Sequence, residues 1–468
     1  MQTSRIAALT RGVRTAAVRG SPSKRYISSA AAIASSSQLY ATTNSRPSSA
    51  FRSTTLAKQQ PHHNASSSSS EPLSKTPLYD LHLVHGGKMV PFGGFHMPVQ
   101  YSGLSVSQSH IFTREHASLF DVSHMVQRIF SGPGSAKFLQ RVTPSDCENL
   151  APFKSTLSTL MTTDGKGGIS DDTIVARLPE ENTFYVVTNA GCREKDNAYL
   201  DQEISKWNSE NAELQVKEER WDGRGLIALQ GPQAAEVLEE VLSQDLKSVL
   251  FGESFRAKFP GTNSELLISR GGYTGEDGFE ISIPAGDTVK VTEKLLSFGP
   301  EKVQLAGLGA RDSLRLEAGM CLYGHDLNDS ITPVEAGLSW IIPKERRTAD
   351  AGYYGSDVIA KQLVPKSKGG SGVERRRVGL IVEGAPAREG AEIVTRAEEG
   401  KETVKLGVVT SGCPSPSLGK NIAMGYVKDG FHKAGTEVDV LVRGRPRKAV
   451  VAKMPFVPTK YWKGTAPA

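Results

Sequence analysis

Cysteine is scarce in this chain: four are spread over 468 residues, and no two of them form a Cys-x-x-Cys pair. That spacing argues against a zinc site or a disulfide scaffold and suits a reducing compartment. No run of about 18 apolar residues is present, which argues against a transmembrane helix and a membrane partner. A P-loop, a Ser/His/Asp relay and a metal-binding HxxxH motif are also missing, so the sequence predicts no bound metal.

Acidic residues are absent from the first 70 positions, which contain nine Lys or Arg and no Asp or Glu. The opening MQTSRIAALTRGVRTAAVRG spaces arginines along a possible amphipathic helix, and the stretch is rich in Ser, Ala and Thr. This composition is typical of a mitochondrial transit peptide. A disordered basic tail is the alternative, because hydrophobicity is low and a run of serines follows. We interpret residues 1–70 as a mitochondrial transit peptide and disordered leader and expect a location in the matrix.

The net charge of +6 is unevenly distributed: it is +9 in 1–70, −12 in 71–365 and +9 in 366–468. A basic whole-chain charge of this origin is no evidence for nucleic-acid binding, and no arginine-rich groove with interleaved aromatics is present. The stretch PKSKGGSG at 365–372 indicates a linker. We therefore expect two mature parts, 76–362 and 373–462.

The two parts differ in pattern. Residues 105–123 repeat apolar positions every three to four residues, which predicts a helix. Asp-Gly and Gly-Gly between two strand-like runs predict a hairpin over 162–178. Other expected elements are short helices at 134–143 and 231–242 and strands at 183–190 and 225–231. After the linker, short β runs punctuated by Gly and Pro predict a small β-barrel or sandwich, at 376–384, 405–416, 422–427 and 437–456.

Two adjacent carboxylates in GGISDDTIV form the first candidate site. A strand starting near Ile169 sends Asp171 and Asp172 to opposite faces. The alternation does not decide which of them points inward. The alternative to a functional site is that both aspartates lie on a solvated turn, which is the more common position for two adjacent acids.

The glycine-rich stretch RGGYTGEDGFEIS (270–282) is the second candidate. It is not a GxGxxG motif and runs into a strand, so it is no dinucleotide fingerprint. Glu280 lies opposite the apolar face of that strand, where a carboxylate can accept hydrogen bonds from a heterocycle. We expect Glu276 and Asp277 to face water.

The third candidate is GLGARDSLRLEAGMCLYGHDL (307–327), a helix on which Arg311 and Arg315 share a face. Two such arginines need carboxylates. Asp312 and Glu317 in a structural ion-pair network, and an anionic ligand, are equally good partners.

The order of the motifs resembles the aminomethyltransferase family, the T-proteins of the glycine cleavage system, from about Thr76 to Trp462. The segments that carry the resemblance are GGKMVPFGGFHMPVQY, FDVSHM, GGISDDTIV, VTNAGCREKD, LQGP, GGYTGEDGFEIS, GLGARDSLRLEAGMCLYGHDL, TSGCPSPSLGKNIAMGYV and MPFVPTKYW.

The resemblance implies an α+β fold, a three-lobed folate-binding cloverleaf with two α+β lobes and a small C-terminal β-barrel. It also implies an activity: the methylene carbon on the aminomethyl-lipoyl arm of H-protein is transferred to tetrahydrofolate. Ammonia is released and 5,10-methylenetetrahydrofolate forms. The implied partners are lipoylated H-protein and tetrahydrofolate.

The resemblance also assigns roles to residues. It places the functional aspartate at Asp171 and leaves Asp172 to structure. The pterin-contacting glutamate falls on Glu280 and a folate-contacting arginine on Arg311. The other residues implied near folate are Tyr461, Tyr101, Met125, Asn189, Tyr273 and Arg388, of which Arg388 would meet the glutamate tail or remain a solvated surface residue.

Two alternatives share the fold family. The first is a non-catalytic folate-binding protein of iron–sulfur cluster assembly, but RGGYTGEDG lacks the cysteine of the signature Lys-Gly-Cys-Tyr-x-Gly-Gln-Glu. The second is the folate domain of a flavin-linked dehydrogenase, for whose flavoprotein portion this chain has no room. The basic cluster Arg443, Arg445, Arg447 and Lys448 either steers acidic H-protein or protects a β edge from aggregation.

Overall fold

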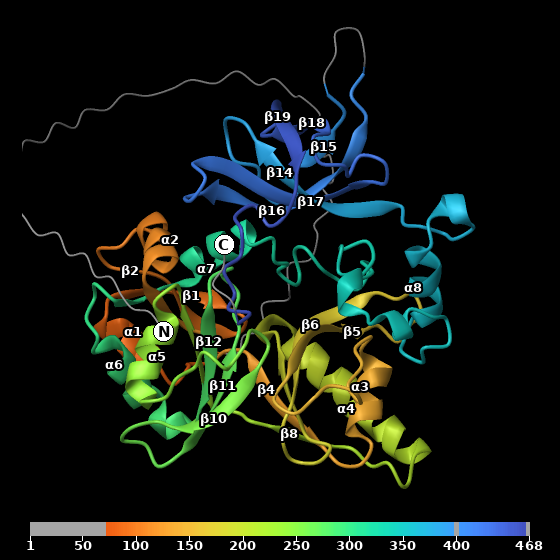
Figure 1. Cartoon of the computed structure of the whole chain (residues 1–468). Helices are drawn as coiled ribbons and strands as arrows, with labels where there is room; N and C mark the ends of the chain where they lie inside the picture. Colours follow the sequence, from red (N-terminus) through yellow and green to blue (C-terminus); the bar gives the residue numbers. More distant parts are fainter. Residues whose placement is uncertain (1–71, 397–401, 465–468) are drawn as a thin grey trace, which may run out of the picture. The chain divides into compact units, whose positions relative to one another are not determined.

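Two β-sheets and a barrel dominate the computed structural model, which describes residues 72–396 and 402–464 (Figure 1). The transit peptide expected at 1–70 lies outside these residues. The first sheet has six strands in the order β10 (Ser254–Lys258), β11 (Glu265–Arg270), β12 (Gly278–Ile283), β9 (Gly225–Gln230), β3 (Ala117–Asp121) and β13 (Val303–Leu305). The second has five, in the order β5 (Ser155–Met161), β6 (Ile169–Arg177), β7 (Phe184–Thr188), β4 (Val126–Ser131) and β8 (Lys217–Arg220). A separate pair is formed by β1 (Gly87–Phe92) and β2 (Phe95–Tyr101).

Strand alternation separates the cores of the first sheet. On β12, Phe279, Ile281 and Ile283 enter a core that also contains apolar residues of helices α5 (Ala234–Leu242) and α6 (Thr288–Leu296). The opposite face turns to a core shared with the five-stranded sheet, in which Leu226 and Leu267 meet Ala176 and Val187. Glu280 lies on this second face.

The five-stranded sheet is covered on its other side by helices α3 (Ser135–Val142) and α4 (Arg193–Glu210), the second of which follows the short 3-10 turn η1 (Ala190–Cys192) (Figure 1). Trp207 of α4 packs there with Phe138 and Phe130. The remaining helices are α1 (Tyr79–Val84), α2 (Val106–Glu115), α7 (Leu308–Glu317) and α8 (Ser356–Leu363), with 3-10 turns at Ala285–Asp287, Ser339–Ile341, Lys344–Arg346 and Lys366–Lys368.

The region after the linker is a closed barrel, which confirms the prediction of an α+β fold with a C-terminal β-barrel. Its strands follow the order β14 (Arg375–Val382), β17 (Lys420–Lys428), β16 (Lys405–Ser415), β15 (Glu392–Val394), β18 (Glu437–Val442) and β19 (Arg445–Ala452). Inward residues such as Leu380, Val409, Val427 and Val440 fill it. Closure pairs the strand edges that an open sheet would leave free.

One predicted helix is too long. The helix expected at 105–123 stops at Glu115, and residues 117–121 form β3 in the six-stranded sheet. All five residues of β3 are buried, because one face packs on α5 and the other on the shared core. Burial on both faces removes the alternation that marks a strand, so the segment reads as a continuation of the preceding helix.

The predicted hairpin is confirmed: β5 and β6 pair as antiparallel strands on either side of a turn with positive φ at Gly165 and Gly167. The chain passes close to its neighbour at Gly168, where a Cβ would lie 1.9 Å from the carbonyl oxygen of Asp329. Only glycine fits such an approach. A register shift, in which Leu160 opposes Asp171 and Met161 opposes Ile169, makes a bulge just before the aspartate pair.

The carboxylate of Glu317, at the end of α7, joins the barrel to the helices beside the six-stranded sheet. It accepts hydrogen bonds from His110 at 3.0 Å and Arg114 at 2.8 Å, both on α2. It also accepts from the hydroxyls of Ser415 and Ser417 in the barrel. Its side chain is fully buried. The burial of a charge is tolerated here because every oxygen has several donors.

We predict that Glu317→Gln lowers the free energy of unfolding by about 3–5 kcal/mol at pH 7, because it removes a buried charge that Arg114, His110 and two serines hydrogen-bond. Burial alone would raise the pKa of Glu317, but the hydrogen bonds from His110 and Ser415 outweigh it and lower the pKa to about 2. A lowered carboxyl pKa stabilises the fold above the unfolded value of about 4.3, and this contribution is lost as pH falls toward 2. The difference between variant and wild type should therefore shrink in acid.

Urea unfolding at pH 7 and pH 3 measures both effects. Glu389→Gln is the matched control, because Glu389 is an exposed carboxylate that also pairs with a histidine, His325. Loss of this exposed pair is expected to cost less than about 1 kcal/mol. Equal destabilisation by the two variants would contradict the role given to Glu317.

Candidate active site

A cavity opens between the facing sheets, lined by β6 and β7 on one side and β9, β11 and β12 on the other. Its one acid is Glu280. Ile174 of β6 is 37% exposed, although it sits in the middle of a central strand of its sheet. Exposure at such a position shows that the two sheets do not close fully over it, although the cavity itself has a volume of only about 20 Å³.

Glu280 and Arg311 form an incomplete ion pair beside this cavity, with 3.9 Å between Oε1 and Nη2. Burial raises the pKa of Glu280, and the positive charge of Arg311 opposes that shift. Burial likewise lowers the pKa of Arg311. Nη1 of Arg311 is buried and has no hydrogen-bond partner among residues 72–396 and 402–464. The pair therefore offers a ligand both an acceptor and a free donor.

Aromatic rings hold the guanidinium of Arg311 in place. It lies 5.0 Å from the ring centroid of Tyr273 and 5.9 Å from that of Phe120. Tyr273 is itself fixed, because its hydroxyl donates to the carbonyl of Cys321. Burial raises the pKa of Tyr273, and the negative charge of Asp172 adds to the shift, which places Asp172 in the same electrostatic environment.

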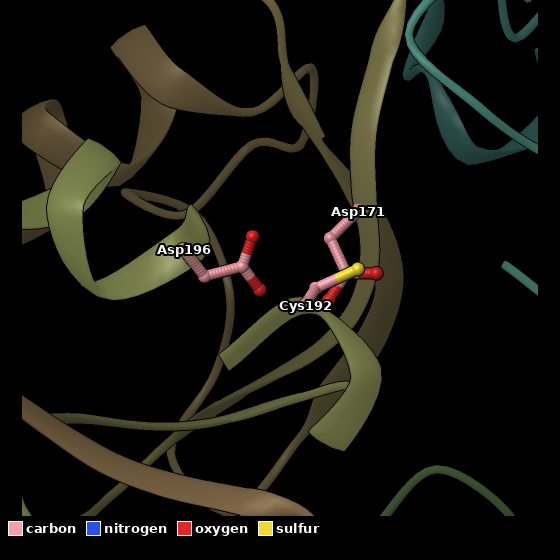
Figure 2. A group of neighbouring side chains, drawn as sticks. All are labelled: Asp171, Cys192 and Asp196. Carbon is pink, nitrogen blue, oxygen red and sulfur yellow. The ribbon is translucent and has the colours of Figure 1, made fainter. Parts of the chain in front are cut away.

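The aspartate pair divides between the two faces of β6. Asp172 is partly exposed and lies on the face of Ile174 and Ala176, toward the cavity. Burial raises its pKa to about 7, and the charge of Asp171 contributes. Asp171 is fully buried on the opposite face, near Cys192 and Asp196 (Figure 2).

Asn189 connects the two carboxylates. Its backbone N–H donates to Oδ2 of Asp171 and its side-chain amide to Oδ1, both at 2.9 Å. The same amide donates to Oδ1 of Asp172 at 3.0 Å. The position of Asp172 therefore depends on an asparagine that Asp171 holds from behind.

The placement differs from the one that the sequence led us to expect. The resemblance gave the functional role to Asp171 and a structural role to Asp172. In the structure, Asp172 faces the cavity that contains Glu280, and Asp171 faces away from it toward α4. The bulge at Ser170 and the side on which α4 packs decide this, and neither is readable from the alternation.

The other predicted residues are more scattered. Met125 packs at the edge of the shared core and lines a second cavity of about 240 Å³ with Phe95, Arg193 and Trp221. Tyr101 is 5% exposed and contacts His82 at 2.9 Å, in a buried chain that continues to Asp121. Tyr461 stacks on Phe251 at 4.1 Å. Arg388 is exposed on the barrel and donates to the carbonyl of Gly412.

Two acids expected to face water are paired instead. Glu276 is 1% exposed and accepts hydrogen bonds from Arg114 and Lys460. Asp277 pairs with Arg270 at 2.6 Å. Their cationic partners, apart from Arg270, lie far away in the sequence, so a glycine-rich turn with acids looks solvated when read alone. The sequence also gave no role to Asp196 or Cys192, although both lie in VTNAGCREKD, the segment that follows β7.

Comparison with known proteins agrees with this architecture. Residues 78–346 match the model of the GCVT N-terminal domain, and residues 375–458 match the glycine cleavage T-protein C-terminal barrel domain. A probable mitochondrial aminomethyltransferase of Schizosaccharomyces pombe is 49% identical over 395 residues, covering 84% of this chain and 95% of the relative. The mitochondrial aminomethyltransferase of Pisum sativum is 47% identical over 394 residues, covering 84% and 91%.

A solved structure supports the same assignment. The glycine cleavage system aminomethyltransferase T from Bartonella henselae superimposes with a TM-score of 0.73 at 39% identity, covering 84% of this chain and all of the other.

The chain belongs to the glycine cleavage T-protein family. It is an aminomethyltransferase with the mitochondrial location that its N-terminal composition predicted. Nothing in these comparisons favours the iron–sulfur assembly alternative. Among the described residues, no helix has both the length and the apolar character needed to cross a membrane.

Proposed function

We propose that this enzyme transfers the methylene carbon from the aminomethyl-lipoyl arm of H-protein to tetrahydrofolate. The observation that carries the proposal is that Asp172 lies on the face of β6 that turns toward the cavity between the sheets, and that the incomplete Glu280–Arg311 pair lies beside the same cavity. A carboxylate of near-neutral pKa on this side of β6, together with the free acceptor and donor of the Glu280–Arg311 pair, suits a nitrogen heterocycle that reacts through amine groups.

The reaction balances without an external oxidant. Bonds from the methylene carbon to N5 and N10 of the folate replace its bonds to nitrogen and sulfur. The two folate N–H protons end on ammonia and on the lipoyl thiol. The carbon is cationic as ammonia leaves, and a fixed carboxylate stabilises that charge and orients the attacking amine. The pKa of Asp172, about 7, also allows it to carry a proton at neutral pH.

Glu280 and Arg311 are proposed to hold the pterin. The N–H groups along one edge of a pterin suit the carboxylate of Glu280, and such charge-assisted hydrogen bonds are stronger than neutral ones. Arg311, confined between the rings of Tyr273 and Phe120, would supply its free Nη1 to a pterin acceptor. The folate contacts of Tyr461, Tyr101, Met125 and Arg388 stay proposals that rest on the resemblance.

The basic cluster of the barrel is proposed to steer H-protein. Arg443, Arg445 and Lys448 are exposed at the β18–β19 hairpin. An excess of one charge on an exposed hairpin attracts an oppositely charged protein over about a Debye length, so association should be salt-sensitive.

We predict that Asp172→Asn lowers folate-dependent ammonia release by about 10²-fold or more, because it removes the negative charge that stabilises the cationic carbon. Asp171→Asn should lower it less, since Asp171 acts through Asn189. Both variants are assayed with aminomethylated H-protein and tetrahydrofolate, with circular dichroism as a check of folding. The reverse order, with both variants folded, would restore the role of Asp171 and overturn that of Asp172. Release by the wild type that ignores folate would overturn the proposed reaction.

For the pterin contact, we expect Glu280→Gln to weaken tetrahydrofolate binding by about 1–3 kcal/mol, because charged hydrogen bonds become neutral ones. Calorimetric titration measures the change. Glu265→Gln is the control, since Glu265 is exposed at the start of the neighbouring strand β11. Unchanged affinity in Glu280→Gln would remove the pterin from this position.

The docking surface is tested by the triple variant Arg443→Gln, Arg445→Gln and Lys448→Gln. We predict a KM for H-protein raised about three- to tenfold at low salt, a weaker salt dependence and an unchanged kcat. The triple variant Lys420→Gln, Lys428→Gln and Lys433→Gln removes as much charge from another part of the barrel. Equal effects in the two triple variants would show that net charge matters and this cluster does not.

A further inference from the structure

A second carboxylate pair, Asp171 of β6 and Asp196 of α4, lies on the side of the five-stranded sheet that the helices cover. We propose that Asp196 carries a proton which it donates to Asp171, and that this acid–carboxylate pair is the positioning unit that holds Asn189, and through it Asp172, in place.

The geometry places two carboxylates and a thiol in one buried group. One ligand atom each from Asp171, Cys192 and Asp196 lies within 4.8 Å of the others (Figure 2). Asp171 and Asp196 are both 0% exposed. Neither oxygen of Asp196 has a hydrogen-bond donor among the described residues. Two ionised carboxylates repel at this distance, whereas a single proton turns one of them into a donor for the other.

Nearby cations are occupied elsewhere. Arg128 binds Glu218, Asn197 and the hydroxyl of Thr188. Lys195 binds the carbonyl of Ser170, the hydroxyl of Tyr323 and Asp329. Five charged or titratable groups face Asp196: Asp171 on β6, Cys192 on η1, Lys195 and Tyr199 on α4, and Arg128 on β4. Tyr323 faces Asp171 and Cys192. A proton is the simplest neutralising partner that remains.

The electrostatics agree with this geometry. Burial raises the pKa of Asp196 to about 9, and the charge of Asp171 adds to the shift. Burial also raises the pKa of Asp171, while the proximity of Asp196 and the N–H groups of Asn189 oppose that rise. Both oxygens of Asp171 already accept hydrogen bonds from Asn189, whereas those of Asp196 have no donor among the described residues, so Asp196 is the member that keeps the proton and Asp171 is the member that accepts.

The pair is linked to the proposed reaction through three residues. Asp171 accepts both the backbone and the side-chain hydrogen bonds of Asn189, whose amide also binds Asp172. Loss of the proton would put two charges behind Asn189 and repel Asp171 from its place. This link to catalysis rests on the proposed function, whereas the shared proton itself does not.

A bound metal ion is the competing explanation for the same three residues. It would need Cys192 as a thiolate, but burial, together with the charges of Asp171 and Asp196, raises the pKa of that thiol far above its usual range. Both oxygens of Asp171 already accept hydrogen bonds from Asn189. The geometry therefore favours the proton, and the experiment below separates the two.

Thermal stability tests the proton directly. A carboxyl group whose pKa is higher in the folded chain binds more protons when folded, so it lowers stability as pH rises from about 4 to about 9. Asn at position 196 donates a hydrogen bond to Asp171 without titrating. We expect Asp196→Asn to raise Tm by about 2 °C or more at pH 8.5 and by much less at pH 4.5.

Glu194→Gln is the control for this measurement, since it removes one exposed negative charge from the same helix and should show no such pH-dependent gain. A lower Tm for Asp196→Asn at pH 8.5, or a stoichiometric metal in the purified wild type whose removal by chelation lowers Tm, would overturn the shared proton.

Kinetics test the positioning role. The wild type should lose kcat above about pH 9, and Asp196→Asn should keep its neutral kcat within about threefold without that alkaline loss. Asp196→Leu, which has no donor, should lose about tenfold or more in kcat with little change in KM for tetrahydrofolate. An alkaline loss that persists unchanged in Asp196→Asn would overturn the positioning role. A folded wild type without transferase activity would overturn the proposed function and leave the Tm comparison valid.

Discussion

The alternation of side chains along a β-strand is the constraint on which this site depends. Asp171 and Asp172 are neighbours in the chain, yet β6 sends one to the helical layer and the other to the cavity between the sheets. The same rule separates Glu280 from Phe279 and Ile281 on β12. Glu280 lines the cavity itself, and Asp172 lies further along the β6 face that also contributes Ile174 and Ala176 to the cavity wall. A register slip of one residue in either strand would exchange acids for apolar residues and destroy both the core and the site.

The second requirement is that the sheets and the barrel hold fixed positions relative to each other. Helix α7 provides this, because different side chains along it bind the sheet region and the barrel. Arg311, near its start, approaches Glu280 at the cavity, whereas Glu317, at its end, binds α2 and the barrel. Arg315 adds a second link, to Asp326 at 2.6 Å and to Ser411 of β16. The sequence suggested one network shared by Arg311 and Arg315, with ion pairing and ligand binding as equal possibilities. In the structure, Arg315 takes part in the ion-pair network and Arg311 is left with a free donor for a ligand.

Local patterns predicted the fold better than they predicted the site. Turn residues at 165–168, the alternation around Glu280 and the punctuated strands after residue 375 all act within a few residues, so they are legible in the sequence. Strand β3 was missed because burial on both faces hides its period. Glu276 was missed because Arg114 and Lys460 lie 162 and 184 residues away. The assignment of Asp171 relied on a motif position, and the motif carries no information on which face α4 covers.

Buried ion pairs in this protein fall into two kinds, and the difference bears on function. Glu317 is saturated: Arg114 is 2.8 Å away, and histidine and serine groups occupy the remaining lone pairs. Glu280 and Arg311 are 3.9 Å apart, and Arg311 retains a buried nitrogen with no partner. An unsaturated pair costs stability, since each group has lost water without full compensation. That cost is recovered only if something else supplies the missing hydrogen bonds. A folded protein that leaves such a pair beside a cavity is therefore preorganised for a polar ligand, which would supply the hydrogen bonds that the pair lacks.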